Sequence, residues 1–223
     1  MPKSPNPLIP KSPVSMSLPT PGFLYFDFGK VVVDFDVERM IAQMAALGAV
    51  ESLVIRQLLF RDGLQAQYET GLITSADFHS AVCTRLGCDI AIESLATACA
   101  DFFELRPRML PVLGGLKQAG YRLGILSNTC EYHWEHCRRR YRIVAEGFDV
   151  HALSYRIGAM KPDPAIYLAA AKLAGCRPKE IFFVDDLPEN VAGARAAGFD
   201  AELFTDVRTL VSDLWRRGLR FNY

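Results

Sequence analysis

Residues 26–33 read FDFGKVVV, and this stretch places a single carboxylate, Asp27, near the end of an apolar run. The run covers residues 23–28 and predicts a strand that is buried on both faces. A buried strand seldom ends on an unpaired charge, because burying a charge without a partner is costly. Asp27 therefore predicts a ligand or a partner at the end of this strand. Gly29 raises a second question, which is why a glycine and not another acid follows.

The rest of the chain divides into two patterns. Residues 37–105 repeat apolar side chains at helical spacing, and no convincing strand is recognised there, so they predict a small all-helical insertion. After residue 106 strands and single helices alternate, with strands expected at 121–126, 150–154, 181–184 and 201–204. Such alternation predicts right-handed crossovers and a parallel sheet. The predicted fold is α/β, with a Rossmann-like parallel sheet core in residues 22–36 and 106–223.

Composition and charge argue against several classes of partner. Lys+Arg and Asp+Glu both number 25, so the net charge is zero, which disfavours nucleic acid or an anionic membrane. The basic cluster at residues 138–142 is interpreted as a solvated helix end. Residues 1–21 are rich in Pro and Ser and predict a disordered tail with no signal peptide. Six cysteines without a C-x-x-C pair indicate reduced thiols. We expect a cytoplasmic protein, monomeric or weakly dimeric.

Chemically active residues gather where the predicted strands end. In an open parallel sheet, ligands bind outside the carboxyl ends of the strands. The residues at those ends, or at the start of the following segment, are Asp27, Ser127, Asn128, Lys161, Asp185 and Asp186. Mg²⁺ prefers hard oxygen ligands, and a lysine neutralises phosphate oxygens. The set therefore predicts a site for a divalent cation and a phosphate group.

These residues belong to four short motifs, which read DFGKV at 27–31, LSN at 126–128, KPD at 161–163 and FVDDLPEN at 183–190. In this order the motifs resemble those of the haloacid dehalogenase superfamily, over the chain from about residue 22 onward. The segment YETGLIT at 68–74 resembles a stretch common in the helical caps of that superfamily. The Asp-x-Gly motif is similar to that of the bacterial α-D-glucose-1-phosphate phosphatase type. The resemblance implies that residues 37–105 form a cap over the core.

The resemblance also implies an activity and a role for each motif residue. The activity would be a Mg²⁺-dependent phosphatase that hydrolyses a small phosphorylated metabolite, such as a sugar 1-phosphate, through an aspartyl-phosphate intermediate on Asp27. The ligands of Mg²⁺ and their supporting residues would be Asp27, the main-chain carbonyl of Gly29, Asp186, Asp185 and Asn190. The residues in contact with the phosphoryl group or the rest of the substrate would be Ser127, Asn128, Lys161 and Arg106.

Gly29 departs from the pattern, because most phosphatases of this superfamily carry a proton-donating aspartate at that position. A general acid contributes about 10²- to 10⁴-fold in rate. Three outcomes are open: a leaving group that needs little protonation, an acid recruited from the cap, where Glu69 and Asp77 are available, or loss of catalysis with phosphate binding retained. Lys30 is also unusual; an inward ammonium would assist the leaving group, and we favour an outward one.

Two other functions and one other metal site are compatible with parts of the sequence. A dehalogenase of the same superfamily would also lack the second acid, but the Asp185–Asp186 pair favours Mg²⁺. A non-catalytic phosphate-binding or interaction module would use the same fold. A zinc site is conceivable on the predicted helix that carries four Cys and His residues, Cys130, His133, His136 and Cys137. Four ligands on one helix cannot easily surround an ion, so we favour packed thiols and partly exposed imidazoles.

Overall fold

The computed structural model describes residues 20–223, so residues 1–19 of the predicted tail lie outside the described part of the chain. Its centre is a five-stranded sheet in the order β5-β4-β1-β6-β7, in which all neighbouring strands are parallel. The strands are β1 (Phe23–Phe26), β4 (Leu123–Ser127), β5 (Val150–Leu153), β6 (Ile181–Asp185) and β7 (Asp200–Leu203). The predicted parallel α/β core is confirmed, with strand ends within two residues of those expected.

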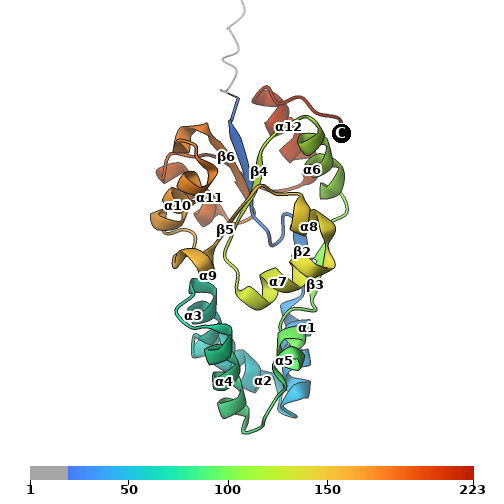
Figure 1. The fold of residues 1–223 in the computed structure, drawn as a ribbon, viewed down its shortest axis with the longest axis vertical. Coiled ribbons are helices and arrows are strands. Elements are labelled where there is room, and N and C mark those ends of the chain that lie inside the picture. Colours follow the sequence, from blue (N-terminus) through green and yellow to red (C-terminus); the bar gives the residue numbers. More distant parts are fainter. Residues whose placement is uncertain (1–19) are drawn as a thin grey trace, which may run out of the picture.

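Both faces of the sheet are covered by helices. Successive side chains of the central strand β1 point to opposite sides, and all of them are apolar and buried. Phe23 and Tyr25 belong to one apolar cluster, which includes side chains of α10 (Pro164–Ala174) and α11 (Pro188–Ala196). Leu24 and Phe26 belong to a second cluster, with side chains of α6 (Met109–Gln118) and α12 (Val207–Arg216). Figure 1 shows α10 and α11 on one side of the strands and α6 and α12 on the other. Each buried large apolar side chain contributes roughly 1.5–3 kcal/mol.

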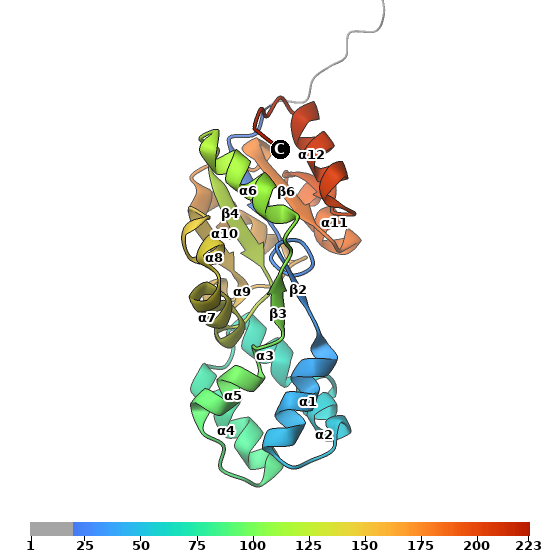
Figure 2. The ribbon, with the colours of Figure 1, turned by 90° about the vertical axis from the view of Figure 1, so that its right-hand side faces the viewer.

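A helical unit extends from the core in the long direction of the molecule (Figures 1 and 2). It contains α1 (Val37–Leu47), α2 (Ser52–Arg56), the π-helical turn η1 (Gln57–Arg61), α3 (Leu64–Thr70), α4 (Ser75–Leu86) and α5 (Ile92–Ala98). The helix starts follow local chemistry: the Asp36 carboxylate accepts bonds from the backbone N–H of Glu38 and Arg39 at the start of α1. Thr74 and Asp77 form a capping box at the start of α4.

The helical unit joins the core through a two-stranded antiparallel ribbon, and the sequence did not predict it. The ribbon pairs β2 (Val33–Phe35) with β3 (Phe103–Leu105). The expectation that residues 37–105 contain no strand was therefore wrong at their end. Strands of three residues show too little alternation to be recognised, and this pair forms only when segments about 70 residues apart meet.

The remaining elements connect the sheet strands. They are α7 (Glu131–Arg140), α8 (Arg142–Glu146), α9 (Ser154–Ile157) and the 3₁₀ turn η2 (Pro178–Glu180). Within residues 20–223, no single helix has the length and apolar character needed to cross a membrane. One sharply bent pair, α1 with the α2–η1 segment, passes the same test by length and composition only.

Candidate active site

Asp27 lies directly after β1, at the carboxyl edge of the sheet. Its N–H donates to the main-chain O of Val184 at 2.9 Å, which continues the pairing of β1 with β6. Its side chain is buried, and the N–H of Phe28 donates to Oδ1 at 2.7 Å. The strand thus carries the carboxylate into an environment from which water is largely excluded.

Lys161 supplies the opposite charge. Its Nζ donates to Asp27 Oδ1 at 2.7 Å, to Asp185 Oδ2 at 2.6 Å and to the main-chain O of Leu126 at 3.0 Å. The Lys161 side chain is 1% exposed and that of Asp185 is fully buried. Burying such charges is tolerated only when they are paired and their hydrogen bonds are satisfied. The bridge from Asp27 through Lys161 to Asp185 answers why a buried strand ends on a charge.

The segment that carries Lys161 is held in place by Asn128. The Nδ2 of Asn128 donates to the main-chain O of Lys161 at 2.9 Å, and the N–H of Lys161 donates to Asn128 Oδ1 at 2.7 Å. These reciprocal bonds attach the Lys161 main chain to the end of β4. Ser127 precedes Asn128, is buried, and donates from Oγ to the main-chain O of Asn128 at 3.3 Å.

Asn190 completes the surroundings of Asp185. The Asn190 Nδ2 donates to both carboxylate oxygens of Asp185, at 3.0 and 3.1 Å, and the N–H of Leu187 donates to Oδ1 at 2.9 Å. The Asn190 main-chain O in turn accepts a bond from the hydroxyl of Tyr167 at 2.8 Å. This arrangement makes Asn190 a support for Asp185 through its amide nitrogen.

Negative charge exceeds positive charge at this edge of the sheet. Oxygens of Asp27, Asp185 and Asp186 lie within 4.8 Å of one another, and a single ammonium, that of Lys161, bridges two of them. Among the described residues no cation forms an ion pair with Asp186. Burial, followed by the neighbouring Asp185, raises the pKa of Asp186. Hard oxygen donors with an excess of negative charge fit a divalent cation such as Mg²⁺.

Burial also shifts the pKa values of the bridged pair. It raises the pKa of Asp27 to about 7, although the Lys161 ammonium opposes the shift. Burial lowers the pKa of Lys161, but the carboxylates of Asp27 and Asp185 outweigh that effect and raise it. Lys161 is therefore a permanent positive charge, whereas the charge of Asp27 depends on what binds beside it.

Gly29 follows in the same loop, and its place is crowded by Phe35 of β2. A Cβ atom at residue 29 would lie 2.8 Å from Cε1 of Phe35, closer than real Cβ contacts come. A side chain at residue 29 therefore requires the aromatic ring to shift. An acidic side chain at residue 29 would displace Phe35.

Arg106, a predicted substrate contact, and Lys30, expected to point outward, both bind groups outside the aspartate cluster. Arg106 pairs with Asp34 of β2, at 2.6 Å from Nη2 to Oδ1, and does not line the cavity described below. Lys30 donates from Nζ to the main-chain O of Phe35 at 3.0 Å and its side chain is 42% exposed, which matches the outward orientation that the sequence favoured. The Arg106 guanidinium also lies over the ring of Phe204, which follows β7 at the carboxyl edge of the sheet, 5.3 Å from the ring centroid.

The Cys and His residues of α7 do not converge on a metal position within residues 20–223, where the three aspartates form the one group with suitable spacing. His133 is buried, contrary to the expectation of a partly exposed imidazole, and its ring lies edge-on to Phe102 and Phe103. Burial lowers the pKa of His133 to about 4, so its imidazole is neutral at neutral pH.

A cavity of about 130 Å³ opens beside these residues, between the core and the helical unit. From the core it is lined by Gly29, Ser127, Asn128 and Thr129, and from the helical unit by Gln65 and Glu69. Its other walls are apolar or aromatic: Phe28, Phe35, Val37, Met40, Phe60, Phe102, Phe103 and His133. The sequence analysis named Glu69 but none of the aromatic residues that line the cavity, because the sequence does not show which Phe residues of an apolar run face a cavity.

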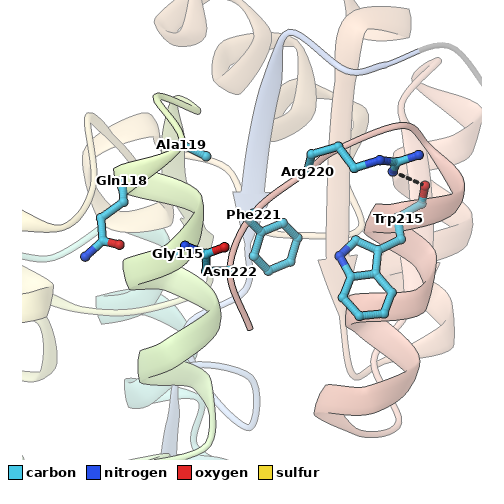
Figure 3. Close-up of a pocket in the computed structure, with 7 residues that line it drawn as sticks. All are labelled: Gly115, Gln118, Ala119, Trp215, Arg220, Phe221 and Asn222. Carbon is cyan, nitrogen blue, oxygen red and sulfur yellow. Dashed lines mark hydrogen bonds between the residues drawn. The ribbon is translucent and has the colours of Figure 1, made fainter.

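A larger and more open hollow, of about 730 Å³, lies near the chain end between α6 and α12 (Figure 3). Its polar groups include Arg220, which donates to the main-chain O of Trp215 at 3.1 Å, and Asn222. Within residues 20–223 no carboxylate lines it, and Gly115–Ala119 on its wall lead into the amino end of β4. It is therefore remote from the aspartate cluster and lacks its chemistry.

Comparisons with known proteins point to one family. The family model described as haloacid dehalogenase-like hydrolase matches residues 26–198. The D-ribitol-5-phosphate phosphatase of Bacteroides thetaiotaomicron is 27% identical over 184 residues, which are 79% of this chain and 88% of that protein.

Solved structures agree with the sequence relatives. A haloacid dehalogenase family enzyme of Bacteroides thetaiotaomicron, crystallised with magnesium and inorganic phosphate, superposes with a TM-score of 0.72 at 30% identity. The superposition covers 81% of this chain and 92% of that one. A haloacid dehalogenase-like hydrolase of Porphyromonas gingivalis superposes with a TM-score of 0.76 at 25% identity, over 88% of this chain and 98% of that one.

Proposed function

Because the chain belongs to the haloacid dehalogenase-like hydrolases, as its four motifs predict, we propose that it is a Mg²⁺-dependent phosphatase of small phosphorylated metabolites. The observation that carries the proposal is the buried bridge from Asp27 through Lys161 to Asp185, with Asp186 beside it. A sugar or sugar-alcohol phosphate is the substrate class that the named relative supports.

Asp27 is the proposed nucleophile. It is buried at the edge of the sheet, and Oδ1 is occupied by the Phe28 N–H and by Lys161. Oδ2 is therefore the oxygen available to attack phosphorus. The ammonium of Lys161 favours the charged form of the carboxylate, against the effect of burial, and fixes its direction. Attack gives an aspartyl-phosphate, which water then hydrolyses.

The carboxylates of Asp27 and Asp186, with the main-chain carbonyl of Gly29, would hold Mg²⁺, and Asp185 and Asn190 would support them. When bound, the cation would supply positive charge to the phosphoryl oxygens. Lys161 adds a fixed positive charge beside Asp27. Ser127 and the backbone of Asn128 lie on the wall of the same cavity and would donate hydrogen bonds to the phosphoryl group.

The helical unit is the proposed cap. Phe60, Gln65 and Glu69 reach the cavity from it, so the cavity is lined by side chains from both parts of the chain. A cavity of about 130 Å³ fits part of a small metabolite and excludes a macromolecule. Exclusion of water strengthens the electrostatic interactions of the aspartates and of Lys161 with the substrate.

The test is phosphate release from a panel of sugar 1-, 5- and 6-phosphates, with Mg²⁺ and with EDTA. We expect release with Mg²⁺, none with EDTA, and none from Asp27→Asn. The matched control is Asp89→Asn, since Asp89 is exposed on the helical unit. Halide release from 2-haloacids without metal would indicate a dehalogenase instead. If neither phosphate nor halide were released, the binding-module alternative would replace the phosphatase.

A further inference from the structure

The leaving oxygen of a phosphate ester needs a proton, and residue 29 cannot provide it. Phe35 stands 2.8 Å from the position of a Cβ at residue 29, so this part of the loop has no room for an acid. Asp77, one of the two acids considered on the helical unit, is also excluded as the proton donor. Its carboxylate accepts hydrogen bonds from the N–H and Oγ1 of Thr74 in the capping box of α4, and it is absent from the cavity wall.

Glu69 is placed differently. It lies in the last turn of α3 and lines the cavity together with Gly29, Ser127 and Asn128. Of the described residues that line this cavity, it is the one with a carboxyl group. The Nε2 of Gln65 donates to its Oε1 at 2.7 Å. This bond orients the carboxyl group and leaves Oε2 to carry a proton.

The main chain at Glu69 is attached to the loop that follows β4. The Oγ of Ser154 lies 2.5 Å from the main-chain O of Glu69 and 3.0 Å from that of Thr129, so either can accept its proton. The same Oγ accepts a bond from the N–H of Thr129 at 2.9 Å. Ser154 therefore holds Glu69 at a set distance from the Ser127–Asn128 end of the sheet.

The surroundings of Glu69 favour its neutral form. Burial raises the pKa of Glu69, and the hydrogen bond from Gln65 only partly opposes the shift. The titratable groups that face it are the Cys130 thiol at the start of α7, whose pKa burial raises, and the neutral imidazole of His133. Among the described residues no cation pairs with Glu69. A carboxylic acid in such a position can donate a proton near neutral pH.

We propose that Glu69, a residue of the helical unit, is the general acid that protonates the leaving oxygen; this rests on the proposed phosphatase function. As Asp27 attacks phosphorus, the P–O ester bond breaks, its electron pair stays on the leaving oxygen, and that oxygen takes the proton of Glu69. Water then attacks the aspartyl-phosphate and gives a proton back to the Glu69 carboxylate. The P–O bond to Asp27 breaks, which releases inorganic phosphate and restores both side chains.

The test compares two phosphate esters of similar size that both suit an aromatic cavity, benzyl phosphate and 4-nitrophenyl phosphate. Benzyl alcohol is a poor leaving group that needs a proton, whereas nitrophenolate leaves without one. In Glu69→Gln we expect kcat/KM for benzyl phosphate, which reports only the steps up to the aspartyl-phosphate, to fall about 10²- to 10⁴-fold, while kcat/KM for 4-nitrophenyl phosphate stays within about threefold. In wild type, kcat/KM for benzyl phosphate falls as pH rises through the pKa of Glu69, and the variant loses this fall.

The matched control is Glu51→Gln, because Glu51 is an exposed acid at the start of α2 whose side chain makes no capping bond. It should leave both rates unchanged. Equal losses on the two esters in Glu69→Gln would mean a structural role and overturn the proposal, as would no loss on either. A wild type that hydrolyses only the nitrophenyl ester would overturn it too. A wild type that releases phosphate from neither ester would overturn the phosphatase function itself.

Discussion

Lys161→Met tests most directly how charge pairing at the site contributes to the free energy of unfolding. The substitution removes the ammonium that lies 2.7 Å from Asp27 and 2.6 Å from Asp185 and keeps a side chain of similar length. Two buried carboxylates then lose their cationic partner and keep only the hydrogen bonds from Phe28, Leu187 and Asn190. The packing change itself should cost less than about 1.5 kcal/mol, because the volume is nearly conserved.

The electrostatic loss is larger. Breaking a buried ion pair by removing one partner costs about 3–5 kcal/mol. Lys161 pairs with two carboxylates, so the upper part of that range applies. Removing the ammonium also raises the pKa of Asp27 beyond the value of about 7 that burial already produces. An acid whose folded pKa is raised destabilises the protein most above that pKa, and the penalty disappears as pH falls toward its unfolded value.

The assay is urea unfolding in EDTA at pH 8 and pH 5, so that no divalent cation replaces the ammonium. We expect the Lys161→Met loss to be about 4–5 kcal/mol at pH 8 and clearly smaller at pH 5. Adding Asp185→Asn to Lys161→Met removes one buried carboxylate that has lost its cation, and it should restore part of the lost stability. Lys172→Met, on an exposed lysine of α10, should change stability by less than about 0.5 kcal/mol. A Lys161→Met loss under about 1 kcal/mol, or a loss equal at both pH values, would refute this reasoning.

Three further predictions concern the surroundings of the site. The pKa of His133 is about 4 in the folded protein and 6.5 in the unfolded chain, so the free energy of unfolding should fall by about 3 kcal/mol as pH falls from 6.5 to 4. Urea titrations of His133→Asn should lack this part of the pH dependence. Gly29→Ala should cost about 1–3 kcal/mol through its contact with Phe35, and thermal denaturation should show a smaller cost in a Phe35→Leu background; equal costs in both would contradict the contact. Gly71→Ala should destabilise more than Gly87→Ala, because both have positive φ but only at residue 71 would the Cβ clash with a main-chain oxygen, that of Tyr155; equal melting temperatures would count against this.

Much of the core was predictable because its signals are local. The three central strands, β1, β4 and β6, are short apolar runs next to a polar residue, and burial on both faces removes the alternation that an exposed strand would show. The carboxyl ends of parallel strands meet at one edge, so Asp27 and Asp185 could be placed together from order alone. The ribbon of β2 and β3 was not predictable, because neither strand carries a signal without the other.

The contacts that decide the chemistry depend on segments far apart in the chain. Arg106 was expected to contact the substrate, but its guanidinium forms an ion pair with Asp34 across the β2–β3 ribbon. Phe35 crowds the place of a side chain at residue 29, and no pattern in the sequence indicates which ring does so.

By itself, the sequence determined the parallel sheet, the family and the carboxylates at the strand ends, because these follow from apolar periodicity and from short motifs. Only the tertiary structure decided that Lys161 lies between two of those carboxylates and that Glu69, not Asp77, reaches the cavity. The physical reason is that charge pairing and burial depend on distances between residues up to 134 positions apart. The glycine that follows Asp27 is explained by such a contact, the approach of Phe35.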